Sequence, residues 1–141
     1  MPDQIPSSPL TILLADDDPE DLELIEQAIV SIEPGADLHK VLNGKAVIQF
    51  LKSRPDADLP CLIILDYNMP ELTGSEVLSL LCRDQRYTHI PKVVLSTSST
   101  PVHIHECMGN GATDYFVKPN NMRELTGLAE RMLSLCNGKG S

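Results

Sequence analysis

Four charged side chains stand where short apolar runs of the sequence end. Asp16 and Asp17 follow the first run, Asp66 follows another, and Lys118 ends the last. Carboxylates gathered in one place are unfavourable unless a cation neutralises them or they take up protons. Carboxylate oxygens suit a hard ion such as Mg²⁺, which keeps water ligands and binds beside phosphoryl groups. We therefore expect a Mg²⁺ site, with Mn²⁺ as the alternative ion, if the ends of these runs meet.

A hydroxyl group completes a set of residues that could carry phosphoryl-transfer chemistry. Ser96 ends a further apolar run, "PKVVLS". The carboxylate of Asp66 can act as a nucleophile and form an acyl phosphate. A divalent cation and the ammonium group of Lys118 would offset the charge on the transferred group.

The runs that carry these residues have the pattern of buried strands. They are short, nearly continuous in apolar residues and bounded by polar segments, as strands of a parallel sheet are. The pattern predicts five strands, at residues 10–15, 37–42, 61–66, 91–96 and 113–118.

A helical pattern follows each predicted strand. After the first strand, Asp18 can cap a helix, Pro19 suits the first helical position, and Glu20 and Asp21 form an acidic first turn. The later helical patterns lie at residues 44–51, 75–83, 101–108 and 121–136.

Alternation of strand and helix predicts an α/β fold. We expect a doubly wound, five-stranded parallel sheet with helices on both faces and right-handed crossovers. Binding residues of such sheets lie beyond the carboxyl ends of the strands, where the charged side chains stand. We expect one domain at residues 10–136, between a flexible lead at residues 1–9 and a flexible tail at residues 137–141.

Composition excludes several classes of protein. The formal net charge of −9 argues against a nucleic-acid-binding surface. No apolar run approaches the roughly 20 residues that span a bilayer, and the first residues lack the pattern of a secretory signal. We therefore expect a cytoplasmic protein. Its cysteines are widely spaced and are expected to be reduced: Cys61, Cys82, Cys107 and Cys136.

Four motifs occur in order along residues 10–136: "ILLADDDPEDLELI", "LIILDYNMPELTG", "VVLSTSS" and "GATDYFVKP". Together they resemble the response-regulator receiver domain of two-component signalling, in its stand-alone, CheY-like form. The long segment "SRPDADLP" before the third strand resembles the subgroup that includes partners of phytochrome-type kinases. The resemblance implies a flavodoxin-like sheet with strand order 2-1-3-4-5.

The resemblance also implies a metal and phosphoryl site. Asp66 corresponds to the phosphoacceptor. Asp17, Asp66 and the backbone carbonyl of Asn68 correspond to direct metal ligands, and Asp16 to a residue that holds the metal through water. Lys118 corresponds to the ion-pair partner of Asp66 or its phosphate.

Three further residues carry implied roles in switching. Ser96 corresponds to a hydroxyl that bonds a phosphoryl oxygen, and Tyr115 to an aromatic residue whose orientation reports the state of Ser96. Pro119 corresponds to a proline that usually follows a cis bond.

The function implied is that of a phosphorylatable switch. A histidine kinase or histidine phosphotransfer protein would give its phosphoryl group to Asp66 in a Mg²⁺-dependent reaction. The protein would act on no other substrate, and its acyl phosphate would hydrolyse slowly. The signal would pass to a downstream protein, or to a homodimer, through the face formed by the fourth helix, fifth strand and fifth helix. Neither nucleic acid nor membrane is an expected partner.

Two other functions fit parts of the sequence. A haloacid-dehalogenase-like phosphatase would use Asp16 as nucleophile and Asp18 as acid, although the following Pro19 does not match the usual motif. The second alternative is a docking module that is not phosphorylated. A metal site at His103 and Cys107 is also conceivable from their spacing, but two ligands do not make a closed zinc site.

Overall fold

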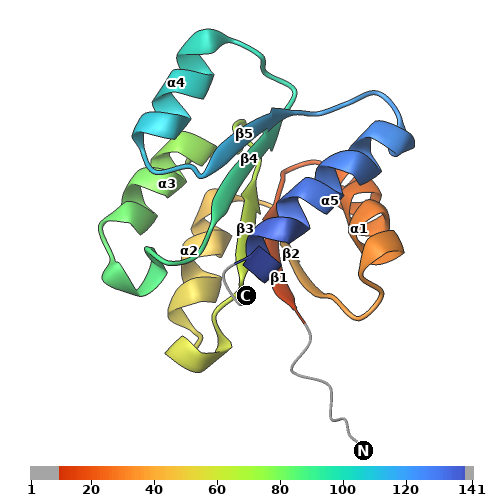
Figure 1. Ribbon diagram of the computed structural model, residues 1–141. Helices are drawn as coiled ribbons and strands as arrows, with labels where there is room; N and C mark the ends of the chain where they lie inside the picture. Colours follow the sequence, from red (N-terminus) through yellow and green to blue (C-terminus); the bar gives the residue numbers. More distant parts are fainter. Residues whose placement is uncertain (1–9, 139–141) are drawn as a thin grey trace, which may run out of the picture.

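Five parallel strands form the centre of the protein in the computed structural model, which describes residues 10–138 (Figure 1). They are β1 (Thr11–Ala15), β2 (Asp37–Val41), β3 (Leu62–Leu65), β4 (Lys92–Ser96) and β5 (Asp114–Val117). Their order across the sheet is β2-β1-β3-β4-β5. This confirms the predicted fold class and strand order. The predicted lead at residues 1–9 lies outside the described residues.

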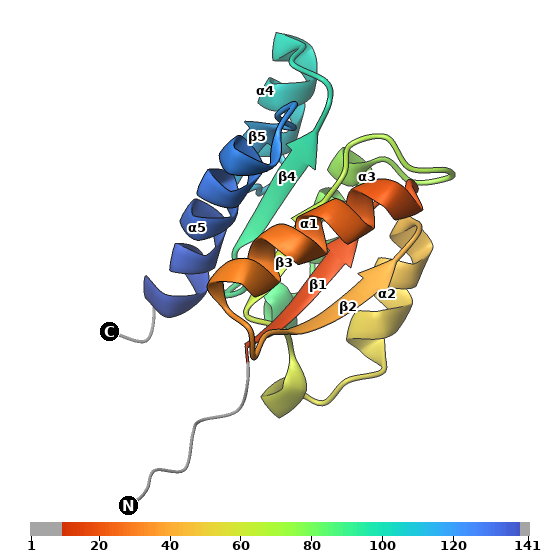
Figure 2. The same ribbon diagram turned by 90° about the vertical axis from the view of Figure 1, so that its right-hand side faces the viewer.

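Helices cover both faces of the sheet (Figures 1 and 2). On one face lie α1 (Pro19–Ile32) and α5 (Met122–Gly138), and on the other lie α2 (Gly44–Lys52), α3 (Gly74–Cys82) and α4 (Pro101–Gly109). Two short 3₁₀ helices, η1 (Asp56–Asp58) and η2 (Gln85–Tyr87), were not predicted. None of the helices in residues 10–138 has the length and apolar character needed to cross a bilayer. Since α5 continues to Gly138, only residues 139–141 of the predicted tail lie outside the described part of the chain.

Local capping interactions determine where the helices next to the sheet begin. The Oδ1 atom of Asp18 accepts a hydrogen bond from the backbone N–H of Glu20 at 3.0 Å, so Asp18 caps α1 as predicted. Thr73 and Glu76 form a reciprocal capping box at the start of α3. This box starts α3 at Gly74, one residue earlier than its apolar pattern indicates.

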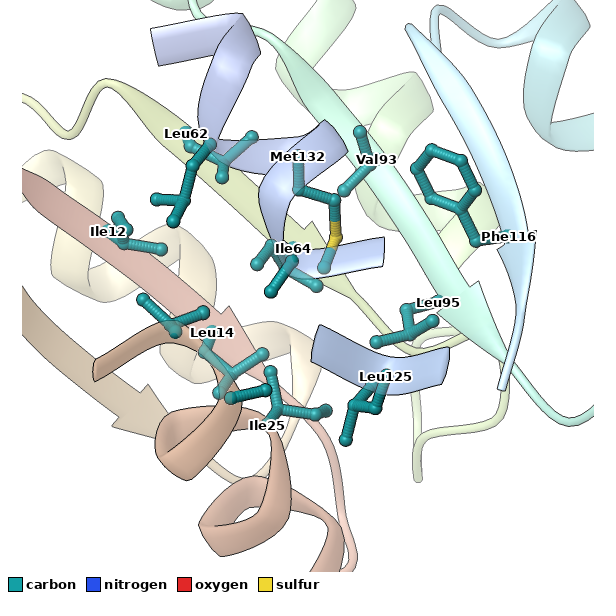
Figure 3. Close-up of a cluster of buried hydrophobic side chains, with 14 of the residues drawn as sticks. Ile12, Leu14, Ile25, Leu62, Ile64, Val93, Leu95, Phe116, Leu125 and Met132 are labelled. Atoms are coloured by element: carbon teal, nitrogen blue, oxygen red, sulfur yellow. The ribbon is translucent and has the colours of Figure 1, made fainter. Parts of the chain in front are cut away.

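The core is split into two apolar layers by the sheet. Alternate residues of each strand face opposite layers, so Ile64 contributes to the layer under α1 and α5, and Ile63 to the other. Figure 3 shows the first layer, where Met132 of α5 lies over Ile64. Because β1, β3 and β4 are covered on both faces, their sequences are largely apolar, with Lys92 and Ser96 of β4 as buried polar exceptions. The parallel pairing of β1 with β3, from Ile12 opposite Leu62 to Ala15 opposite Leu65, sets the relative position of the ends of these strands.

A disulfide joins Cys61, just before β3, to Cys136 in the last turns of α5. The prediction that all four cysteines are reduced is therefore wrong for this pair. Packing of α5 along the sheet brings their Cα atoms to 5.2 Å across 75 residues of sequence. Cys82 and Cys107 are free, the former exposed and the latter buried.

Candidate functional site

The predicted site residues meet at the carboxyl ends of the strands. The backbone N–H of Asp66 bonds to the carbonyl of Ala15 at 2.9 Å, which sets the end of β3 beside the end of β1. In the same way, the N–H of Lys118 bonds to the carbonyl of Ser96 at 2.8 Å and joins the ends of β5 and β4. Parallel pairing thus brings residues from distant parts of the sequence to one edge of the sheet.

Three carboxylates form an acidic cluster at this edge. Asp16, Asp17 and Asp66 each offer an oxygen atom, and these atoms lie within 4.8 Å of one another. Asp16 and Asp66 are buried, whereas Asp17 is exposed. Oxygen ligands with one side open to water are the set that Mg²⁺ or Mn²⁺ prefers, so the residues fit the ion that the sequence predicts. Asn68, whose backbone carbonyl is the remaining predicted ligand, lies in the loop after β3 with its side chain exposed.

Burial makes ionisation of Asp16 unfavourable. It raises the pKa of Asp16 from 3.8 to about 6, and the charge of Asp66 adds to the rise. Hydrogen bonds from the Lys118 side chain and the Asp18 backbone oppose this shift. A divalent cation would relieve the remaining cost.

Lys118 supplies the positive charge of the site and forms the predicted ion pair with Asp66, but its hydrogen bonds go to two other carboxylates. Its Nζ atom donates hydrogen bonds to Asp16 Oδ2 at 2.7 Å and to Asp21 Oδ2 at 2.8 Å. The predicted partner, Asp66 Oδ2, lies at 3.6 Å, an ion pair without a hydrogen bond. Burial lowers the pKa of Lys118, but the hydrogen bonds to Asp16 and Asp21 and the charge of Asp66 outweigh it and raise that pKa above its ordinary value.

Ser96 and Tyr115 are linked through the loop that follows β4. Ser96 is fully buried, and its Oγ atom accepts a hydrogen bond from the N–H of Ser98 at 3.2 Å. The hydroxyl of Tyr115 donates to the carbonyl of the same Ser98 at 2.7 Å. Ser98 thus connects the predicted switch hydroxyl to the predicted aromatic residue.

Comparison with known proteins identifies the family. The family model for the response regulator receiver domain matches residues 12–130. This chain belongs to that family. Among curated relatives, the two-component response regulator ORR11 of Oryza sativa subsp. indica is 35% identical over 91 residues, which are 64% of this chain. The matched part spans only 60% of the length of that relative.

Solved structures of phytochrome-associated regulators are similar to this receiver domain. The phosphorylated cyanobacterial phytochrome response regulator RcpA matches with a TM-score of 0.83 and 26% identity, over 94% of this chain and 97% of that one. The Mn²⁺-bound form of the response regulator Rcp1 matches with a TM-score of 0.77 and 27% identity, over 89% of this chain and 93% of that one. The expected resemblance to the phytochrome-associated regulators is confirmed.

Tyr67, next to Asp66, connects the site of this receiver domain to α4. Its hydroxyl donates to Glu106 Oε1 at 2.7 Å, and its ring stacks on the imidazole of His103. Burial and the bond to Glu106 raise the pKa of Tyr67 to about 12. His103 Nδ1 also shares a hydrogen bond with the hydroxyl of Ser98 at 2.7 Å. Beyond the presence of polar residues in α4, nothing in the sequence predicted this network.

Two further points of the sequence concern His103 with Cys107 and the peptide bond before Pro119. The metal cluster found within residues 10–138 is the one described above, and it does not include His103 or Cys107. The peptide bond between Lys118 and Pro119, whose state the sequence left open, is trans, as are the others in the described chain.

The loop after Asp66 is held close to α3 by a glycine. The N–H of Gly74 bonds to the carbonyl of Tyr67 at 2.8 Å. A Cβ atom at Gly74 would lie 2.5 Å from the carbonyl oxygen of Asp66, so the fold has no space for a side chain there. No motif in the sequence predicted this role for Gly74, although a glycine at a helix start can indicate such a close approach.

Proposed function

We propose that this receiver domain accepts a phosphoryl group on Asp66 from a histidine kinase or a histidine phosphotransfer protein. The observation that carries the proposal is the convergence of the acidic cluster, the ammonium group of Lys118 and the hydroxyl of Ser96 beside Asp66. The solved forms of its structural relatives, phosphorylated RcpA and Mn²⁺-bound Rcp1, support the same reading. We place this transfer in the cytoplasm, as the sequence predicts.

In the proposed reaction, a carboxylate oxygen of Asp66 forms a bond to phosphorus. The bond between phosphorus and the donor histidine nitrogen breaks, and its electron pair stays on that nitrogen. Asp16, Asp17, Asp66 and the backbone carbonyl of Asn68 would hold Mg²⁺, which supplies positive charge for the phosphoryl oxygens when bound. Lys118 offsets further negative charge, and Ser96 donates a hydrogen bond to a phosphoryl oxygen. The protein acts on itself alone, and hydrolysis of the acyl phosphate returns it to its resting form.

The signal would leave through α4, β5 and α5, which lie together along one side of the molecule (Figure 2). This face carries exposed apolar side chains: Val102, Met108, Val117 and Met122. Ser98 lies between Ser96, Tyr115 and α4, so a change at Ser96 has a direct route to the face. We propose a downstream protein or a second copy of the chain as the partner.

Labelling with a small phosphodonor tests this function. Incubation with acetyl phosphate should phosphorylate the parent protein only when Mg²⁺ or Mn²⁺ is present, and Asp66→Asn should not be labelled. A phosphatase that uses Asp16 and Asp18 would instead hydrolyse a generic phosphate ester and keep that activity in Asp66→Asn. Asp18 caps α1 and is exposed, which disfavours this alternative. A parent protein that takes up no phosphoryl group would support the docking module.

A further inference from the structure

The ammonium group of Lys118 is shared among three carboxylates at unequal distances. Its Nζ atom lies 2.7 Å from Asp16, 2.8 Å from Asp21 and 3.6 Å from Asp66. An ammonium group has three donors. Two of them make short, charge-assisted hydrogen bonds, to Asp16 and Asp21, and Asp66 remains beyond hydrogen-bond distance. In the described conformation, Lys118 therefore forms an ion pair with Asp66 but gives both of its short hydrogen bonds to other carboxylates.

Asp21 differs from the other two carboxylates in its place and surroundings. It lies in the first turn of α1, and its oxygen atoms are not part of the acidic cluster. Its side chain is 30% exposed, whereas that of Lys118 is 11% exposed. A cation in the cluster would share the charge of Asp16, but Asp21 would keep its full charge for Lys118. Asp21 is thus the carboxylate best placed to hold Lys118 once the metal is bound.

We propose that Asp21 is a positioning residue that holds Lys118 in a resting position and slows phosphoryl transfer to Asp66. This inference rests on the proposed function. During transfer, negative charge develops on the phosphoryl oxygens beside Asp66, and Lys118 must turn toward them. The hydrogen bond to Asp21 is made in the resting state and weakened in the transition state. An interaction of that kind lowers the rate, because only contacts that are stronger in the transition state speed a reaction.

The direct test compares labelling rates with acetyl phosphate at saturating Mg²⁺. Asp21→Asn keeps the shape of the side chain but removes its charge, and we expect it to be labelled about threefold to tenfold faster than the parent, the size of effect of one partly exposed charge-assisted hydrogen bond. Asp21→Glu keeps the carboxylate and should stay closer to the parent rate than Asp21→Asn does. A rate of Asp21→Asn equal to or below that of the parent overturns the proposal.

Glu20→Gln is the matched control for charge alone. Glu20 is exposed in the same turn of α1, and within the described residues it makes no ion pair with Lys118. The control should therefore label at the parent rate. If Glu20→Gln accelerates labelling as much as Asp21→Asn, a general reduction of negative charge explains the result and the positioning role is overturned.

A second measurement separates this inference from the proposed function. In a double-mutant cycle, the melting temperatures of Asp21→Asn, Lys118→Met and the double variant are compared with that of the parent. Coupling between the two substitutions supports the holding contact whether or not the parent protein is labelled. If the changes in melting temperature are additive, the holding contact between Asp21 and Lys118 is overturned. Absence of labelling in the parent, by contrast, counts against the proposed function.

Discussion

The phenol ring of Tyr67 stacks on the imidazole ring of His103, with centroids 4.0 Å apart and planes 13° from parallel. Tyr67 directly follows the proposed phosphoacceptor, and His103 lies in the first turns of α4. The hydrogen bond between His103 and Ser98 extends this contact to the loop after β4. The loop that bears Asp66 is therefore joined to the proposed signalling face by side chains of this chain.

The hydrogen bond from Tyr67 to Glu106 should contribute measurably to stability. Tyr67→Phe keeps the stacked ring but loses the bond to a partly solvated carboxylate, so we expect the free energy of unfolding to fall by about 1 kcal/mol. Urea denaturation measures this. Tyr87→Phe is the control, because Tyr87 is as buried but its hydroxyl only accepts a longer hydrogen bond, from Arg86 Nη1 at 3.3 Å. Equal losses of unfolding free energy in Tyr67→Phe and Tyr87→Phe would contradict a specific role for the hydrogen bond to Glu106.

Gly74 should be required for the geometry of the loop that bears Asp66. In Gly74→Ala, the new methyl group would meet the Asp66 carbonyl oxygen at 2.5 Å and the Tyr67 Cα atom at 3.1 Å. Because backbone atoms cannot move aside without shifting the loop, we expect a loss of about 1–3 kcal/mol in stability and slower labelling of Asp66.

Gly127→Ala provides the matched control for that substitution. Gly127 lies within α5 and has no neighbouring atom within 4 Å of the added Cβ. Alanine there should raise the free energy of unfolding by about 0.5–1 kcal/mol and leave labelling unchanged. Labelling of Gly74→Ala at the parent rate would show that the loop does not need the glycine.

The disulfide between Cys61 and Cys136 should be detectable by thiol counting. The unfolded, unreduced protein should show two free thiols, those of Cys82 and Cys107. Because the bond closes a loop of 75 residues, Cys61→Ser should lower the free energy of unfolding by about 2–5 kcal/mol. Cys82→Ser, at an exposed free cysteine, should change it by less than about 0.5 kcal/mol. Four reactive thiols in the purified protein would contradict the disulfide.

The raised pKa of Asp16 predicts a pH dependence of stability. Between pH 3.8 and about 6, the folded protein binds a proton at Asp16 that the unfolded chain does not bind. The contribution of this group to stability therefore rises as the pH falls through this window, and ionised Asp16 destabilises the fold above it. In chelator-containing buffer, the stability of Asp16→Asn relative to the parent should fall by about 1–3 kcal/mol from pH 7.5 to 4.5. If the free energies of unfolding of Asp16→Asn and the parent changed with pH in parallel, the raised pKa of Asp16 would be contradicted.

The sequence predicted the main features of the site because they depend on the backbone. Strands buried on both faces give continuous apolar runs, and residues at the ends of parallel strands must lie at one edge of the sheet. The strand pattern alone therefore predicts that Asp16, Asp66 and Lys118 lie close together. Resemblance to a family then assigned them separate roles.

Contacts between side chains of distant elements could not be predicted in this way. The bond from Lys118 to Asp21 depends on the rotation of α1, and the stack of Tyr67 on His103 depends on the position of α4. Cys61 and Cys136 meet because α5 runs along the sheet, which the spacing of cysteines does not reveal. These contacts arise from helix packing, whose side-chain detail is not encoded in any short motif.

Chemical mapping of the phosphorylated residue tests the central claim most directly. The protein is incubated with acetyl phosphate, with and without Mg²⁺, then treated with borohydride, which reduces an aspartyl phosphate to homoserine, and analysed by peptide mass spectrometry. We predict homoserine at position 66 in the Mg²⁺-treated sample and unmodified aspartate there in the metal-free sample. Phosphorylation at a different residue, or its absence at Asp66 with Mg²⁺ present, would contradict the account.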